Sequence, residues 1–347
     1  MRLLITGNLG YIGTELTSYL KKKYKKYYLV GYDTGFFKKN LIKSNKHSYF
    51  SKVDHQINKD IRKISKKDLS NIDAVIHLAA LSNDPIGKKY HRLTKSINLE
   101  SSKNLFKQSC QKKVKKFIFA SSCSVYGLGG NKSKIESSSL SPLTDYAKSK
   151  INFEKYVQKS KKKIEFTGLR YSTACGISSR IRLDLVLNDF VASALINNKI
   201  ELLSKGDAWR PLIDVYDMCR SIDWAIHRTG KKNIIVNVGK NSNNIKIINL
   251  AKKVQKYFPK LKLVINKKAL SDKRSYKVDF SFFKKIAPRY QPIKTLDQTI
   301  IELKKFLKNK NIKKKFRESN LIRLRKLDNL QKKKQISKNL FWIHNGN

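Results

Sequence analysis

The chain is poor in cysteine, and it contains no long apolar run. Its four cysteines among 347 residues, Cys110, Cys123, Cys175 and Cys219, lack the CxxC spacing of zinc or redox motifs. This pattern argues against a disulfide scaffold and a metal site, and it favours free thiols. No run approaches the roughly 18 apolar residues that a membrane helix requires. We read no signal or transit segment at the start, and we expect a cytoplasmic protein without a membrane span.

Acidic residues are also scarce. The 25 aspartates and glutamates stand against 76 lysines and arginines, which gives a net charge of +51. A charge of this size raises the hypothesis of a polyanion-binding protein. Most of the basic residues are lysines spread over the whole chain, and no RNA-binding aromatic motif accompanies them. We therefore favour solvated lysine surfaces and expect no specific nucleic acid.

Short apolar stretches alternate with amphipathic ones in the first half of the chain. Helical spacing occurs in 11–23, 91–110 and 144–160. Strands are expected between these helices, at 2–6, 27–32, 74–78, 116–120 and 164–169. Apolar strands that alternate with amphipathic helices predict an α/β fold with a doubly wound parallel sheet.

The pattern changes after about residue 170. Helices are expected at 184–196, 217–226 and 247–258, with short strands near 201–203 and 234–238. We interpret residues 1–170 as one domain, 171–307 as a smaller mixed α/β lobe partly interleaved with it, and 308–347 as a basic tail. In the tail, Leu321, Leu324 and Leu327 recur at helical spacing, and the apolar stretch 341–343 is expected to dock onto the body.

A glycine-rich loop joins the first strand to the first helix. It reads TGNLGYIG and places Gly7, Gly10 and Gly13 three residues apart. The first glycine permits a tight turn, the second lets a diphosphate approach the backbone, and the third lets the helix pack on the strand. Asp33 ends the second strand, where a carboxylate accepts hydrogen bonds from ribose hydroxyls and repels a 2′-phosphate. The segment predicts a Rossmann-type site for NAD rather than NADP.

Two further segments carry groups suited to catalysis. Tyr146 and Lys150 are four residues apart, which places them on one face of a helix. An ammonium beside a phenol lowers the pKa of the phenol and makes it a usable base near neutral pH. About 20 residues earlier, ASSCSVYG (120–127) ends an apolar strand with several hydroxyls and one thiol.

Together these segments resemble the extended short-chain dehydrogenase/reductase family, and within it the NAD-dependent nucleotide-sugar epimerases and dehydratases. The resemblance covers about residues 1–300 and includes HLAA at 77–80. It implies NAD as cofactor, a nucleotide-diphosphate sugar as substrate, a homodimer, and a place in cell-surface polysaccharide biosynthesis. It implies that Ser122, Tyr146 and Lys150 are catalytic. For the cofactor it implies a larger set: Gly7, Gly10, Tyr11, Ile12, Gly13, Asp33, Asp60, Ile61, Leu78, Ala79, Ala80, Asn98, Ser121, Tyr146 and Lys150.

The same resemblance points to a substrate side. Arg210 and Arg274 match the family's diphosphate-binding arginines, a task that suits their planar forks. The other expected substrate contacts are Ser82, Asn83, Ser122, Ser124, Thr173, Arg180, Arg182 and Asn188.

Several of these assignments have structural alternatives. Arg180 and Arg182 fit surface salt bridges equally well. The 82–84 segment fits a helix cap before Pro85, and Thr173 stands where the family often has asparagine. Asp217 is expected to orient a loop and cap the following helix. His77 lies in an apolar strand and is expected to be structural.

The residues after Ser122 bear on the reaction. In typical dehydratases of the family, an aspartate and a glutamate follow the catalytic Ser/Thr, whereas here Cys123 and Ser124 follow it. Because a dehydratase needs that acid and base, an epimerase is favoured and a 4,6-dehydratase is the alternative. We interpret Cys123 as a small buried residue. From another class, an NAD-binding protein with a lysine-rich RNA-binding surface stays open.

Overall fold

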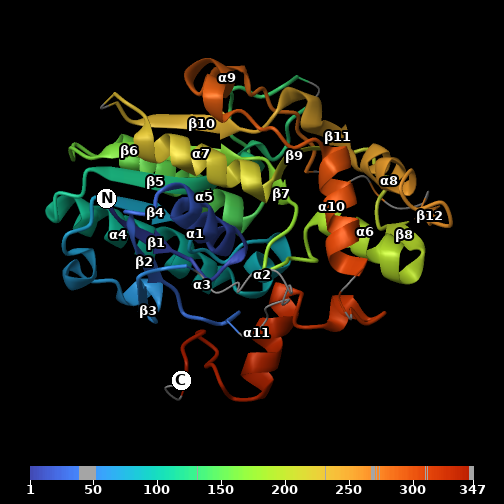
Figure 1. Ribbon diagram of the computed structural model, residues 1–347, viewed down its shortest axis with the longest axis horizontal. Helices are drawn as coiled ribbons and strands as arrows, with labels where there is room; N and C mark the ends of the chain where they lie inside the picture. The colour runs from blue at the N-terminus through green and yellow to red at the C-terminus, as the bar shows by residue number, and fades with distance from the viewer. Residues whose placement is uncertain are drawn as a thin grey trace.

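The structure is a computed structural model that describes residues 1–38, 52–130, 132–230, 232–266, 270, 272, 274–308, 310 and 312–343. Its centre is a parallel sheet of seven strands in the order β10-β6-β5-β4-β1-β2-β3, shown in Figure 1. The strands are β1 (Arg2–Thr6), β2 (Tyr28–Tyr32), β3 (His55–Ile57), β4 (Ala74–His77), β5 (Lys116–Ser122), β6 (Glu165–Tyr171) and β10 (Ile234–Val238).

Helices cover both faces of this sheet because its strands carry apolar side chains on both sides. Leu4, Val75 and Phe117 face a core that includes Phe106 of α4 (Ser101–Gln111) and Phe153 of α5 (Asp145–Gln158). The residues that alternate with them along the strands face α1 (Tyr11–Lys23) and α7 (Val215–His227). The doubly wound parallel sheet predicted from the sequence is confirmed.

The strand order changes direction between β1 and β4, and this position sets the location of the cavity. The chain runs from β1 outward through β2 and β3, and then returns to β4 on the other side of β1. At such a switch point the loops after neighbouring strands separate and leave a crevice at the carboxyl ends. The glycine loop, the segment after β4 and the segment after β5 all lie at this edge.

The second half builds the smaller lobe that Figure 1 shows beside α10. It contains a three-stranded sheet, β11-β9-β7, and a two-stranded sheet, β12-β8. Its elements are β7 (Thr173–Cys175), β8 (Lys199–Leu202), β9 (Trp209–Asp214), β11 (Asn244–Lys246), β12 (Lys262–Ile265), α6 (Val186–Asn197), α8 (Ile247–Gln255) and α10 (Leu296–Lys308). The chain between β9 and β11 returns to the main sheet, because α7 packs on it and β10 pairs with β6.

Short elements connect these layers. After β4 come α2 (Asp84–Lys89), α3 (His91–Thr94) and a π-helical turn, η3 (Lys95–Glu100). The other short helices are η1 (Ile61–Lys63), η2 (Lys66–Leu69), η4 (Cys123–Tyr126), η5 (Asn241–Asn243), α9 (Ser281–Ile286), η6 (Pro288–Tyr290) and η7 (Phe316–Glu318).

The C-terminal tail packs back onto the first half of the chain through α11 (Arg323–Lys332). Leu327, Leu330, Ile336 and Leu340 are buried in the same core as Phe106 and Phe153. The Trp342 indole donates a hydrogen bond to the Thr34 carbonyl, at 2.7 Å. The expected docking of residues 341–343 onto the body is therefore confirmed. Within the described residues, no helix combines the length and apolar character needed to cross a membrane.

Candidate active site

A cavity of about 1140 Å³ opens along the carboxyl ends of β1, β4 and β5. Its walls are the glycine loop, the ends of these strands, the start of α5, the β7 segment of the small lobe and residues 322–325 of the tail. Most residues that the sequence assigned to cofactor and substrate line this one cavity, although they come from segments far apart in the chain.

The glycine loop fits close against the end of β4. Gly7 has a φ of 76°, and a Cβ there would lie 2.8 Å from the Ala79 nitrogen. A Cβ at Gly13 would lie 2.4 Å from the Gly7 carbonyl oxygen. The loop delivers the chain into α1, whose N-cap, Gly10, offers no side chain to the first free N–H groups. Tyr11 and Ile12 line the cavity beside them, so the helix start is available to an anion.

Asp33, after β2, and Asp60, before η1, also line the cavity. Asp33 accepts hydrogen bonds from the backbone of Gly35 and Leu9, and burial raises its pKa. Asp60 forms an ion pair with Arg62, at 2.6 Å between Oδ2 and Nη2. Ile61 follows it in η1 and also lines the cavity, as expected for an adenosine end.

The end of β4 is held in place by Asn98. The Asn98 side chain accepts a hydrogen bond from the Leu81 nitrogen at 2.8 Å and donates one to the Leu81 oxygen at 2.9 Å. It is 1% exposed and does not line the cavity, whereas residues 78–80 do. Asn98 therefore positions the strand end from behind the cavity wall, and the direct cofactor contact expected from the sequence stays a prediction.

Ser122, Tyr146 and Lys150 meet at the cavity wall between β5 and α5. Lys150 Nζ lies 5.4 Å from the centre of the Tyr146 ring and 4.5 Å from that of Phe119. Burial raises the pKa of Tyr146 to about 12, although Arg182 and a hydrogen bond with Ser122 act in the opposite direction. Burial also lowers the pKa of Lys150 to about 7. The sequence predicted a lowered pKa for Tyr146, whereas in the protein without a bound cofactor this pKa is raised.

A buried glutamate that the sequence analysis missed supports this set. Glu154 lies one turn beyond Lys150 on the same face of α5 and accepts a hydrogen bond from Ser121 at 2.5 Å. It also forms an ion pair with Arg170 of β6, at 2.7 Å between Oε2 and Nη2. The spacing of Tyr146, Lys150 and Glu154 at four-residue intervals was the available signal. Ser121 still lines the cavity.

Cys123 and Ser124 point to different surroundings. Cys123 is 0% exposed, its thiol contacts the Arg170 carbonyl at 3.1 Å, and burial raises its pKa well above that of a free thiol. The interpretation of Cys123 as a small buried residue agrees with this geometry. Ser124 lines the cavity, and its hydroxyl is buried with no hydrogen-bond partner among the described residues. A free hydroxyl of this kind suits a substrate contact.

Arg210 and Arg274 lie together on the opposite side of the cavity. Arg210 pairs with Asp272 at 2.9 Å and donates to the Arg274 carbonyl. Arg274 pairs with Asp272 at 2.8 Å and contacts Asp84. Both arginines line the cavity, and so does Thr173. The diphosphate contact expected from the sequence for these two arginines stays a prediction; in the structure both are paired with carboxylates.

The segment after β4 is clamped by a second pair. Arg182 binds Asp184 through two hydrogen bonds and donates to the Ser82 hydroxyl at 3.1 Å. Asn83 caps α2 by accepting from the Ile86 nitrogen, and it also donates to Asp184 at 2.6 Å. All four residues line the cavity. For Asn83, the structure therefore shows the helix cap that the sequence left as an alternative to sugar binding.

Two expected substrate ligands do not line the cavity. Asn188 is buried, and its side chain binds the backbone of Gly176 and Arg182. Arg180 is 4% exposed and donates to the Leu9 carbonyl beneath the glycine loop. Their sequence positions gave the correct region, but both side chains pack inward: Arg180, in a turn, reaches the Leu9 carbonyl, and Asn188, in the first turn of α6, lies next to the Tyr11 hydroxyl of α1.

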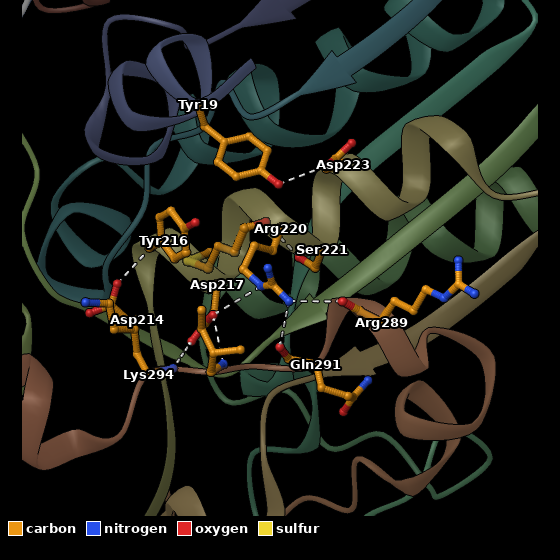
Figure 2. A network of polar contacts seen from close by, with 12 residues as sticks. Tyr19, Asp214, Tyr216, Asp217, Arg220, Ser221, Asp223, Arg289, Gln291 and Lys294 are labelled. Carbon is orange, nitrogen blue, oxygen red and sulfur yellow. Dashed lines mark hydrogen bonds and ion pairs between the residues drawn. The ribbon is translucent and has the colours of Figure 1, made fainter. Parts of the chain in front are cut away.

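Asp217 and His77 have structural partners. Asp217 lies inside α7 and accepts from the backbone nitrogens of Ile293 and Lys294, each at 3.0 Å, as Figure 2 shows. The expected helix cap at Asp217 is wrong, because Asp214 is the N-cap. His77 contacts the Thr6 and Ser102 hydroxyls, and burial lowers its pKa to about 3, which agrees with a structural role.

The residues present fit NAD. The glycine loop leaves no room for Cβ atoms at its turn, the start of α1 offers free N–H groups, and Asp33 stands at the ribose end. The fold and this cavity define a dinucleotide-binding protein with a serine–tyrosine–lysine set beside the cofactor position. The profile of the NAD dependent epimerase/dehydratase family matches residues 3–239, and the chain belongs to this family of NAD-dependent enzymes.

Relatives with similar sequences carry both kinds of name. A protein of Bacillus subtilis named "Uncharacterized UDP-glucose epimerase YtcB" is 27% identical over 269 residues, which cover 72% of this chain and 81% of the relative. A dTDP-D-glucose 4,6-dehydratase of Dictyostelium discoideum is 27% identical over 270 residues, covering 73% of this chain and 61% of the relative. The sequence comparison therefore gives the family without the specific reaction.

Solved structures share the fold. The NAD-dependent NDP-hexosamine 5,6-dehydratase TunA gives a TM-score of 0.78 at 19% identity, covering 90% of this chain and 99% of its own. A UDP-glucuronic acid 4-epimerase from Bacillus cereus, in complex with UDP-glucuronic acid and NAD, gives 0.75 at 23% identity, covering 89% and 99%. The homodimer and the individual ligand contacts inferred from the sequence stay predictions.

Proposed function

We propose that the protein is a nucleotide-sugar epimerase that acts through a transient keto-sugar, with Tyr146 as the base. The observation that carries the proposal is the arrangement around Ser122. Its hydroxyl meets Tyr146 at the cavity wall, whereas the neighbouring Cys123 is buried in the core. Ser122 and Tyr146 line the same cavity as the glycine loop and the Arg210–Arg274 pair. A nucleotide-sugar with its diphosphate on the arginines would reach toward Tyr146 with its sugar.

Each residue then has a defined task. Tyr146 removes the proton from a sugar hydroxyl, and Ser122 hydrogen-bonds the same oxygen. Protonated Lys150, close to the Tyr146 ring, favours the phenolate. When bound, NAD would supply the hydride acceptor for the sugar carbon and the hydride donor for the return to its opposite face. Ser124 and Thr173 offer hydroxyls to the sugar while it turns.

The carboxyl groups near this centre argue against a dehydratase. Water elimination needs a group that donates a proton to the leaving hydroxyl. Two buried carboxyl groups among the described residues near Ser122 and Tyr146 pair with arginines that the substrate is not proposed to displace: Glu154 with Arg170, and Asp184 with Arg182. A neighbouring guanidinium favours the ionised carboxylate, which cannot donate a proton. The Asp184 pKa is lowered accordingly: burial would raise it, but Arg182 overcomes that effect.

A panel of nucleotide sugars tests the proposal. The purified enzyme with NAD is incubated with UDP-, dTDP-, GDP- and CDP-hexoses, because relatives are named for UDP- and dTDP-sugars. Mass spectrometry and proton NMR follow the products. We expect a new anomeric signal without a change in mass for one member. A product lighter by one water would instead support the dehydratase and overturn the epimerase proposal.

Replacing Tyr146 with phenylalanine tests the base. We expect Tyr146→Phe to lower turnover by at least about 100-fold, because the proton-accepting oxygen is lost. NAD affinity, measured by calorimetry, is expected to change little, since the ring is kept. Phe119→Leu is a control that alters the aromatic ring packed against Lys150 without removing an acid–base group. Full activity in Tyr146→Phe would contradict the mechanism.

A further inference from the structure

The C-terminal tail places an arginine against the glycine loop. Arg323 is the first residue of α11, and its Nη2 lies 3.8 Å from the position that a Cβ at Gly10 would occupy. Its guanidinium carbon lies 4.2 Å from the centre of the Phe37 ring. The family profile ends at residue 239, so it assigns nothing to this residue. Gly10 is the position where the glycine fingerprint lets a diphosphate approach the backbone.

The guanidinium groups beside this loop are incompletely paired. Arg323 Nε and Arg180 Nη1 are both buried without a hydrogen-bond partner among the described residues. A buried donor without a partner is costly, and nearly all such groups in folded proteins are satisfied. Arg180 already donates to the Leu9 carbonyl from beneath the loop. Two arginines therefore approach the loop from different segments with donor capacity left over.

The local charge balance points to an anion. Arg180, Arg182 and Arg323 influence one another, and their nearby carboxylates are Asp33 and Asp184. Asp184 is occupied by the fork of Arg182. Burial, together with the charges of Arg182 and Arg180, lowers the pKa of Arg323 to about 9, although Asp184 and Asp33 act in the opposite direction. The surplus of positive charge is what a bound diphosphate would neutralise.

The tail is anchored on both sides of the cavity, so Arg323 is held in place. On the segment after β4, Asp328 pairs with Lys89 at 2.5 Å. At the adenosine end, Arg62 donates to the carbonyls of Asn339 and Leu340 while it also pairs with Asp60. Arg62 therefore links Asp60, which is expected to contact adenine, to the C-terminal tail. Such anchoring limits the entropy lost when the arginine binds a ligand.

We propose that Arg323, which lies beside Gly10, binds the diphosphate of NAD where it approaches the glycine loop, and that Arg180 adds positive charge next to Leu9 of the same loop. The tail would then complete the cofactor site, which in this fold is otherwise formed by backbone N–H groups and the start of α1. The proposal depends on NAD binding and not on the reaction, so its test needs no substrate turnover.

Binding measurements on matched variants test this role. Arg323→Met keeps the length of the side chain and removes its charge, Arg323→Lys keeps the charge without the fork, and Lys332→Ala removes an exposed charge from the other end of α11. Titration calorimetry of the full-length protein gives the affinities for NAD, ADP and adenosine. We expect Arg323→Met to weaken NAD and ADP by about 10- to 100-fold, because charge-assisted hydrogen bonds are lost. Adenosine, which lacks phosphate, should bind all variants alike.

The controls separate this role from two others. Arg323→Lys should recover part of the affinity, and Lys332→Ala should match the wild type. Equal NAD affinity in wild type and Arg323→Met would overturn the proposal. A parallel loss for adenosine would overturn it as well, because it would show that the tail had moved. The affinity for UDP is the last measurement. If Arg323→Met weakened the binding of UDP but not of ADP, Arg323 would belong to the substrate site, and its assignment to NAD would be overturned.

Discussion

Burial sets the protonation of Tyr146 and Lys150 in the protein without ligands. The pKa of the phenol is raised to about 12 and that of the ammonium is lowered to about 7, so each group favours its neutral form more than in water. A base that works near neutral pH needs the opposite change in the tyrosine. The positive charge of the nicotinamide ring of NAD would act in that direction on Tyr146. Cofactor binding and activation of the base are therefore expected to be coupled.

Asp214 is a second residue whose charge is disfavoured by the fold. It caps α7, accepts a hydrogen bond from Thr299 at 2.9 Å, and is 6% exposed. Burial raises its pKa to about 6, with the nearby negative charge of Asp217 adding to the effect. Because the folded-state pKa exceeds the unfolded value, its stabilising contribution is full below about pH 4 and is lost as the pH rises through 6.

Asp214→Asn is therefore expected to stabilise the protein above pH 7. Asparagine keeps an oxygen for the helix cap but never carries a charge. We expect the free energy of unfolding in urea to rise by about 1–3 kcal/mol at pH 7.5, with no gain at pH 4. Glu318→Gln, at an exposed carboxyl, is the matched control and should show little change. A gain that is the same at both pH values would contradict the explanation by ionisation.

Among the secondary-structure elements, α5 and α11 form the site from opposite sides. Helix α5 presents Tyr146, Lys150 and Glu154 on one face, and Glu154 joins it to β5 and β6. Helix α11 reaches the same cavity only through long-range packing, because its buried residues Leu327 and Leu330 lie in a core formed by the first half of the chain. The placement of Arg323 thus depends on how firmly α11 is docked.

Leu327→Ala tests this docking. Removing a fully buried leucine costs about 2–5 kcal/mol, which is expected to weaken the attachment of the tail more than the folding of the body. We expect trypsin to cut between residues 308 and 326 several times faster, as followed by mass spectrometry. Leu203→Ala, at a side chain 88% exposed, should leave the cleavage rate unchanged. Cleavage at the wild-type rate in Leu327→Ala would show that the tail is held by other contacts.

At the scale of the whole molecule, the basic residues that give the net charge of +51 differ in their surroundings. Carboxylates pair with many of the basic groups inside and near the cavity, whereas numerous lysines over the rest of the described surface are exposed. Dispersed lysines attract polyanions without forming a specific site. The net charge therefore predicts good solubility and weak binding of polyanions without nucleic-acid sequence specificity.

Filter binding of single-stranded RNA across salt tests this prediction. We expect retention at about 20 mM salt that is lost near about 200 mM, because displacement of counterions makes unspecific binding steeply salt-dependent. Saturating NAD should change the retention little, since Lys59 is the single exposed lysine among the described residues that lines the cavity. Tight binding that persists at the higher salt would instead support the RNA-binding alternative.

Local patterns in the chain were enough to predict the sheet, the glycine loop, Asp33 and the serine–tyrosine–lysine set. Each depends on residues close in sequence: a strand that alternates with helices, glycines three apart, or two side chains one helical turn apart. For the same reason the family could be inferred before the structure. The elements β7, β9, β11, β12 and α10 were not anticipated, since short strands of a small lobe carry little periodicity.

The sequence alone determined the fold class, the family and NAD as the cofactor, and it predicted which residues bind NAD and transfer protons, because backbone shape and side-chain chemistry are local properties. Only the tertiary structure decided how the long-range partners are assigned. It turned Asn98 and Asn188 toward backbone groups, made Asp214 rather than Asp217 the helix cap, and tied Glu154 to Arg170. It also brought Arg323 to Gly10 across more than 300 positions of the chain. No local pattern encodes that contact, because it follows from burying the apolar face of α11 in a core built by other segments.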